Sequence, residues 1–135
     1  MATQIFINLP VTDLQKSIHF YESIGFSNNP QFTDETAACM VLSEHIYVML
    51  LTHKKLRQFT PKTIANAKNS TEVLNALTLD SREEVDRFMV TAVRNGGNEF
   101  RPTQDYGFMY GWAFEDLDGH IWELIYMDMS QFPQQ

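Results

Sequence analysis

The spacing of apolar and polar positions predicts a strand and then a helix at the start of the chain. Residues 4–11 alternate weakly and are rich in β-branched side chains, as strands are. Apolar residues then recur at helical intervals, at Leu14, Ile18, Tyr21 and Ile24. Thr12 and Gln15 have the spacing of a capping box, which predicts a helix over residues 13–24, and Gly25 is placed to end it in a left-handed conformation.

Further strands and a polar segment complete the first half. Apolar runs lie at residues 26–32, 36–42 and 46–52, and the last two form a predicted hairpin. From residue 53 to residue 70 the composition turns polar and basic around Pro61. This composition indicates a linker that holds a short helix.

The second half repeats this order. Strands are expected at residues 73–79 and 98–103, and a β-hairpin at residues 108–127. Between the two strands, Ser81 and Glu84 repeat the capping-box spacing ahead of an apolar helical stripe that stops at Gly96. The hairpin is predicted because two runs rich in aromatic residues flank Asp118 and Gly119, a pair that supplies the positive φ angles of a tight turn.

Both halves therefore show the order strand, capped helix, glycine stop and three strands, which indicates a duplicated βαβββ unit. The predicted fold is α+β, with the two repeats forming a curved, partly open mixed sheet around a cleft. One domain should cover residues 1–130, with repeats at about 1–53 and 72–130, a linker at 54–71 and a tail at 131–135. Aligning the His-Ile-aromatic triplets at 45–47 and 120–122 places Val48 opposite Glu123.

Composition and charge exclude several classes of partner. The chain has 135 residues, of which 44% are hydrophobic and 20% charged, and its net charge is −7. We expect neither nucleic acid nor an anionic membrane as partner, because both need clustered Lys and Arg. No apolar run approaches the roughly 20 residues of a membrane span, and the start of the chain lacks the pattern of a secretion signal, so a cytoplasmic location is expected.

Glu123 is a single carboxylate inside an otherwise apolar strand. An unpaired charge buried there would cost several kcal/mol or more. Two explanations are open. Either the side chain faces water, or its side of the strand lines a concave site where the carboxylate binds a ligand or a metal.

The order of the elements and four motifs resembles the vicinal oxygen chelate superfamily, which holds glyoxalase I, extradiol dioxygenases and bleomycin-resistance proteins. The motifs are Leu9-Pro10-Val11-Thr12-Asp13-Leu14, His19-Phe20-Tyr21-Glu22-Ser23-Ile24-Gly25-Phe26, Gln104-Asp105-Tyr106-Gly107-Phe108-Met109-Tyr110-Gly111 and Asp116-Leu117-Asp118-Gly119-His120-Ile121-Trp122-Glu123. Within the superfamily the chain is most similar to the bacterial subgroup labelled predicted lactoylglutathione lyase. The resemblance covers nearly the whole length.

The resemblance also implies where a metal would bind. Metal-using members have a His seven residues before the position of Asp13, a Glu late in the last strand of the first half, a His in the first strand of the second half, and a Glu at the position of Glu123. In this chain the first position is Phe6, the second falls at or near Val48, and the third falls in residues 73–75, which contain no His. We therefore expect no divalent metal cofactor, since catalytic sites usually need three protein ligands.

Two functions follow as hypotheses. The first is a small-molecule binding protein of the glyoxalase and bleomycin-resistance type, without the family metal and with an unknown ligand. The second is a lyase or isomerase that acts on a small carbonyl compound, with Glu123 as general base. The residues expected to line the ligand site are Phe6, Asn8, Val48, Leu50, Tyr106, Phe108, Tyr110, Trp112 and Glu123.

We predict that the chain forms a homodimer. The resemblance implies paired units, and the edges and apolar faces of such sheets can be covered by association. Sedimentation at micromolar concentration should give about twice the mass of one chain, which is 15.7 kDa. A single species at the mass of one chain would contradict the prediction.

Overall fold

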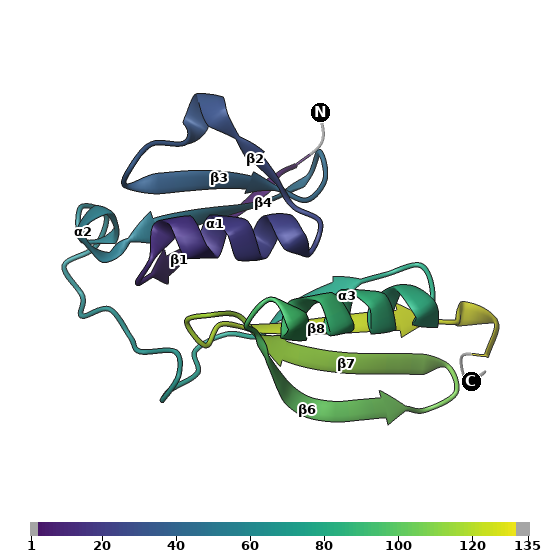
Figure 1. Cartoon of the computed structure of the whole chain (residues 1–135). Coiled ribbons are helices and arrows are strands. Elements are labelled where there is room, and N and C mark those ends of the chain that lie inside the picture. The colour runs from purple at the N-terminus through teal and green to yellow at the C-terminus, as the bar shows by residue number, and fades with distance from the viewer. Residues whose placement is uncertain (1–2, 132–135) are drawn as a thin grey trace. The chain divides into compact units, whose positions relative to one another are not determined.

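A computed structural model describes residues 3–131, and the contacts in it divide the chain into two compact units, residues 1–66 and 67–135 (Figure 1). Each unit holds a four-stranded sheet and a helix that follows the first strand of the sheet. The α+β fold with two βαβββ repeats is therefore confirmed. A cleft lined by both repeats stays a prediction. None of the described helices is long and apolar enough to cross a membrane.

Unit 1 has strand order β1-β4-β3-β2, with β1 parallel to β4 and the other pairs antiparallel. Its elements are β1 (Ile5–Val11), α1 (Leu14–Ser23), β2 (Ser27–Asn29), the 3-10 helix η1 (Pro30–Phe32), β3 (Ala37–Val41), β4 (Ile46–Thr52) and α2 (His53–Leu56). The short helix predicted in the linker is α2. The strand expected over 26–32 stops at Asn29, because Pro30 has no N–H for a sheet ladder and starts η1 instead.

The helix predicted over 13–24 is present as α1, and one detail of its start was wrong. Asp13, not Thr12, is the N-cap, because its side chain accepts a hydrogen bond from the backbone N–H of Lys16 at 3.1 Å. Asp is among the preferred N-cap residues, since its oxygen satisfies a donor that the helix leaves unpaired. Gly25 follows the helix with φ of +111°, as predicted.

Unit 2 has the same topology, with strand order β5-β8-β7-β6 and β5 parallel to β8. Its elements are β5 (Asn75–Thr78), α3 (Arg82–Arg94), β6 (Asn98–Asp105), β7 (Met109–Glu115), β8 (Ile121–Met127) and the 3-10 helix η2 (Met129–Gln131). Ser81 caps α3 as predicted, since its side chain accepts from the N–H of Glu84 at 3.1 Å. Most of the predicted tail, residues 132–135, lies outside the described residues.

The predicted hairpin of β7 and β8 is present, but its connection differs from the expected tight turn. Asp116 organises a longer loop, and its buried carboxylate accepts from the N–H groups of Asp118 and His120 at 3.0 and 2.9 Å. Within this loop, only Gly119 has a positive φ, of +92°. A two-residue turn needs two residues with positive φ. Here the second is not needed, because the hydrogen bonds to the Asp116 side chain hold the loop.

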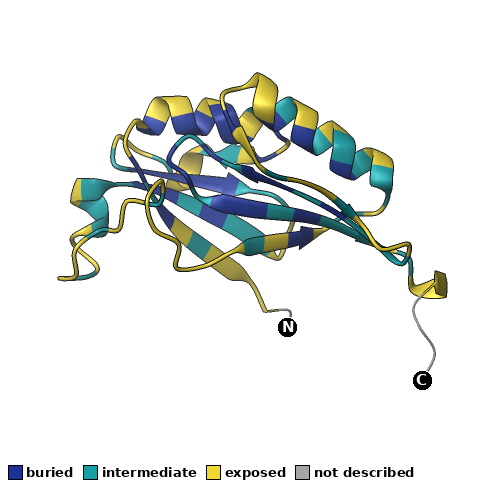
Figure 2. Cartoon of the chain, turned by 90° about the horizontal axis from the view of Figure 1, so that it is seen from below, coloured by how far each residue is buried: buried dark blue, intermediate teal, exposed yellow. Residues whose placement is uncertain are grey.

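One helix covers one face of each sheet, and the buried residues gather between them (Figure 2). In unit 2, Trp122 and Leu124 of β8 and Phe114 of β7 are at most 1% exposed and share a face with Leu77. The rings of Phe114 and Phe88 of α3 lie 6.0 Å apart, so this is the face that packs on α3. Residues at alternate positions belong to the opposite surface, which we call the α3-free face.

Gly119 should be the glycine of unit 2 least tolerant of substitution. A Cβ at Gly119 would lie 2.7–2.9 Å from backbone atoms of Ala67 and Lys68, whereas a Cβ at Gly107, with a similar φ of +81°, would meet only Gln131 at 3.7 Å. Gly107→Ala should cost about 1–3 kcal/mol for the left-handed backbone. Gly119→Ala should cost a further ~1–3 kcal/mol because the backbone must move.

Urea unfolding of both variants tests this prediction, with Gly107→Ala as the matched control. Equal losses in the free energy of unfolding would show that residues 67–68 do not pack against the loop as described.

Candidate functional site

Glu123 lies on the α3-free face of unit 2, in the middle of a row that crosses the sheet. It is paired with Ala76 of β5 on one side and Ala113 of β7 on the other, and Ala113 is paired in turn with Arg101 of β6. Directly paired residues point to the same face of a sheet. The row therefore places one carboxylate and one guanidinium on this face, with a methyl group between them.

Arg101 and Glu123 form an ion pair across the row. Arg101 Nη2 donates to Glu123 Oε2, and the two side chains are 29% and 17% exposed. Neighbouring strands lie about 4.8 Å apart, so the Arg101 and Glu123 side chains together span two strand spacings over Ala113. The expectation that Glu123 would be an isolated charge in apolar surroundings is corrected, because Arg101 of β6 neutralises it.

The ion pair keeps hydrogen-bonding capacity for a ligand. Arg101 Nε is buried and has no hydrogen-bond partner among the described residues. A buried donor without a partner costs about 1–3 kcal/mol. Glu123 Oε2 receives the Arg101 bond, so Oε1 is the oxygen available to a further donor. A small polar group that accepts from Arg101 and donates to Glu123 would satisfy both.

Small and aliphatic residues surround the pair on the α3-free face. Ile121 and Ile125 flank Glu123 along β8, and Gly111 of β7 is paired with Ile125. Gln104 of β6 is paired with Gly111 and adds an amide to the face. This is the mixture of apolar surface and few polar groups that small-molecule sites use.

Two predicted site residues lie on the other face of the sheet. Tyr110 is paired with Tyr126, and Trp112 with Leu124, so both side chains are on the α3 side. The Tyr110 hydroxyl donates to Asp86 of α3 at 2.5 Å, and burial together with this hydrogen bond raises the pKa of Tyr110 to about 12. The Trp112 indole donates to Glu99 at 2.6 Å. The structure therefore does not bring these rings together with Glu123.

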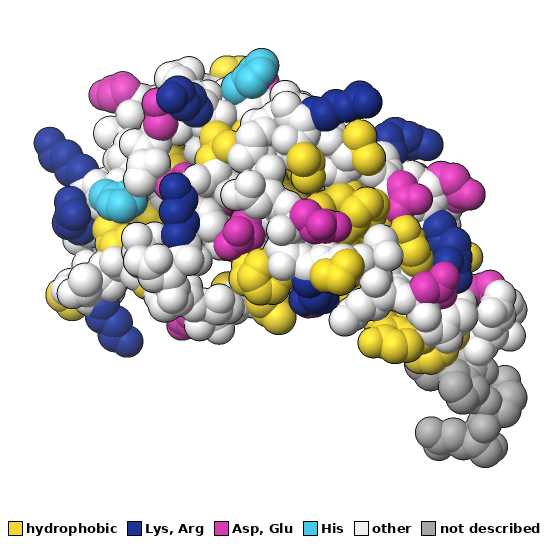
Figure 3. Space-filling model, turned by 60° about the horizontal axis from the view of Figure 1, so that its bottom comes forward, with side chains coloured by type: hydrophobic (Ala, Val, Ile, Leu, Met, Phe, Trp, Pro, Cys, Tyr) yellow, Lys and Arg dark blue, Asp and Glu magenta, His cyan; other side chains and the backbone are white. Residues whose placement is uncertain are grey.

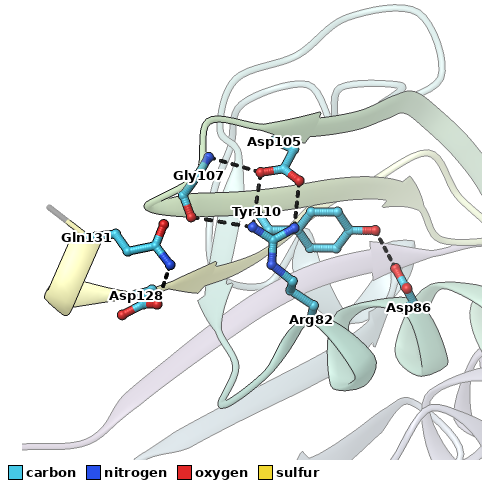
Figure 4. A network of polar contacts seen from close by, with 7 residues as sticks. All are labelled: Arg82, Asp86, Asp105, Gly107, Tyr110, Asp128 and Gln131. Carbon is cyan, nitrogen blue, oxygen red and sulfur yellow. Dashed lines mark hydrogen bonds and ion pairs between the residues drawn. The ribbon is translucent and has the colours of Figure 1, made fainter.

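Tyr106 and Phe108 lie in the connection between β6 and β7. Tyr106 is 59% exposed, and the Phe108 carbonyl accepts from the N–H of Asp128 at 2.7 Å. Beside them, Arg82 forms a two-point ion pair with Asp105 at 2.6 and 3.0 Å and lies over the Tyr110 ring, 4.9 Å from its centre (Figure 4). This network joins the start of α3 to the β6–β7 connection.

In unit 1 the four predicted site residues divide between two faces. The Phe6 ring stacks on Tyr47 with centroids 4.4 Å apart, and exposed Asn8 is on the same face. Val48 and Leu50 are fully buried on the other face, so the structure gives them no access to a ligand. The proposed alignment of Val48 with Glu123 is off by one position, which in a strand reverses the face.

The residues present do not fit a divalent metal of the kind that the resemblance implies. Phe6 is occupied by its aromatic partner, Val48 is buried, and Ala76 stands beside Glu123 in β5, where a metal ligand would be needed. Arg101 already supplies a positive charge to the carboxylate. Within residues 3–131, no group of three or more His, Cys, Asp or Glu is placed to hold a metal ion.

Comparison with a family model and with solved structures gives matches over most of the chain. A family model described as the Glyoxalase/Bleomycin resistance protein/Dioxygenase superfamily matches residues 4–124. Among solved structures, a hypothetical protein SA1046 from S. aureus is 28% identical with a TM-score of 0.78, over 93% of this chain and 95% of that one. No curated protein matches the chain.

Two more distant structures show the same fold. A glyoxalase-related enzyme from Fulvimarina pelagi is 21% identical with a TM-score of 0.76, over 93% of this chain and 88% of that one. The fosfomycin resistance protein FosX from Mesorhizobium loti is 14% identical with a TM-score of 0.70, over 97% of both chains.

The Asp105 ion pair should make stability depend on pH in a defined window. The hydrogen bonds from Arg82 and then from the Gly107 N–H lower the pKa of Asp105 to about 2. Because this value is below the pKa of about 3.9 for an unfolded Asp, the pair stabilises the fold fully above pH ~4 and loses its effect as the pH falls through about 2. Asp105→Asn should therefore lower the melting temperature at pH 7, and the difference from the wild type should shrink between pH 4 and pH 2.

Thermal unfolding of the two proteins across this range measures the difference. Asp80→Asn, which removes an Asp of unit 2 that forms no ion pair within the described residues, is the control. A difference that stays constant down to pH 2 would contradict the prediction.

Proposed function

Because the chain belongs to the Glyoxalase/Bleomycin resistance protein/Dioxygenase superfamily, we propose that it binds a small organic molecule at the Arg101–Glu123 pair, without a divalent metal. The observation that carries the proposal is the pair itself, a partly buried carboxylate and guanidinium on the α3-free face. The Arg101 guanidinium is partly exposed and carries donors besides the one bonded to Glu123, which supports a ligand with an acceptor such as a carbonyl or carboxylate oxygen. Ile125, which is half-buried beside Glu123, supports an apolar part in the same ligand.

The same pair supports a second candidate function, proton abstraction next to a carbonyl group. Glu123 Oε1 would take the proton from carbon, and the Arg101 guanidinium would stabilise the negative charge that develops on the carbonyl oxygen. Both groups come from one sheet, on two strands that are separated by β7. This candidate uses the same residues as binding alone, so the two are separated by whether the bound compound exchanges its proton.

We predict that binding depends on Glu123 and not on the general charge of the sheet. Small aromatic and aliphatic compounds with a carboxylate or ketone group should be screened by thermal shift, and affinities of the positives measured by calorimetry. Glu123→Gln should lower the affinity for these compounds by about tenfold or more, which is ~1.4 kcal/mol of binding free energy, because it removes the charge that orients Arg101. Glu99→Gln is the matched control, because it makes the same change in the same sheet on the α3 side.

Unchanged affinity in Glu123→Gln, or an equal loss in Glu99→Gln, would exclude the Arg101–Glu123 pair as the site. For any ketone that binds, proton NMR in D₂O shows whether the hydrogen next to the carbonyl exchanges. Exchange that is lost in Glu123→Gln would favour the enzyme, and binding without exchange would favour a binding protein.

A further inference from the structure

Positive charge is concentrated in one segment of this acidic chain. Residues 53–71 contain five of the ten Lys and Arg residues and no Asp or Glu. The other five cations together with all seventeen carboxylates leave the rest of the chain with a formal charge of −12. In Figure 3, Lys and Arg side chains with a His among them gather on the left, where α2 and the segment after it lie. Such segregation indicates a local site for an anion.

The segment forms an open cavity within unit 1. The Thr52 side chain accepts from the N–H of Lys55 at 3.2 Å and starts α2. Residues 60–64 line the same cavity as His53 of this helix. The cavity measures about 480 Å³, within the range of about 300–1,000 Å³ typical of small-molecule sites. It is lined by three basic residues, two hydroxyl residues and two apolar residues, namely His53, Arg57, Lys62, Thr60, Thr63, Pro61 and Ile64.

The basic groups that line this cavity have no acidic partner in the described part of the chain. The ion pairs formed by residues 3–131 involve His45, Arg82 and Arg101, and none involves Arg57 or Lys62. Both side chains belong to exposed residues and keep their donors available. The Thr60 oxygen accepts from the N–H of Lys62 at 3.2 Å, which leaves the Thr60 hydroxyl hydrogen to donate to a ligand.

We infer that this cavity binds the phosphate group of a small organic phosphate. A guanidinium matches two phosphate oxygens at once, an ammonium adds a compact charge, and hydroxyl groups can donate to the remaining oxygens. Ile64 and Pro61 provide apolar surface for the organic part. Binding of a long polyanion is disfavoured, because it would extend beyond this segment onto the rest of the protein, which has a formal charge of −12. The site is independent of Arg101 and Glu123.

Phenyl phosphate is a suitable probe, since it combines a phosphate with an apolar group. Its affinity should be measured by calorimetry at 0.15 M salt, where nonspecific attraction between exposed charges is largely screened. The double variant Arg57→Gln/Lys62→Gln should weaken binding at least tenfold. The control Lys54→Gln/Lys55→Gln removes two charges from the same segment at positions that do not line the cavity, and it should change the affinity less than twofold.

Equal losses in the two double variants would overturn the inference, since binding would then follow net charge and not the cavity. Amide chemical-shift mapping on the wild type is a second test that does not depend on how the variants fold. Phenyl phosphate should shift the amides of Thr60, Thr63 and Ile64, and no shift at these positions would also overturn the inference. The inference would also be contradicted if benzoate or inorganic phosphate bound as tightly as phenyl phosphate. Tighter binding of single-stranded RNA than of phenyl phosphate would likewise contradict a site for small organic phosphates.

Discussion

One helix can cover only one face of a four-stranded sheet, and this constraint decides what each unit presents on its other face. In unit 2 the middle of the covered face is filled by Trp122, Leu124 and Phe114, which are at most 1% exposed. A charged group on the α3-free face must therefore find its partner on another strand of that face. Arg101 meets this requirement for Glu123.

The two units repeat a topology without repeating a site. In unit 1 the face that carries Phe6 holds an aromatic stack with Tyr47, whereas the α3-free face of unit 2 holds an ion pair. The resemblance implies metal ligands distributed over both repeats. The pair of Arg101 and Glu123 needs only three adjacent strands of one sheet, so the electrostatic requirements of the carboxylate are met within unit 2.

The sequence predicts the elements well and their faces less well. Residues 46–52 and the Ser81 cap were placed correctly because strand composition and capping are local properties. The face of β4 could not be predicted, because all its residues but the last are apolar or aromatic and show no alternation. The Arg101 contact was missed because it depends on the register of β6 against β7, which two irregularities on either side of Arg101 shift.

In both units the first strand pairs with the last, and this pairing affects the order in which the chain folds during its synthesis. Ile5 is paired with Ile46, and Asn75 with Trp122, so each parallel pair joins segments more than forty positions apart, while the antiparallel pairs form between neighbours in sequence. Contacts between distant segments form slowly because the loop between them must close first. On the ribosome, β1 emerges early, and its backbone N–H and C=O groups have no strand to pair with until β4 has been synthesised. Unit 1 can then close its sheet before the strands of unit 2 have been synthesised.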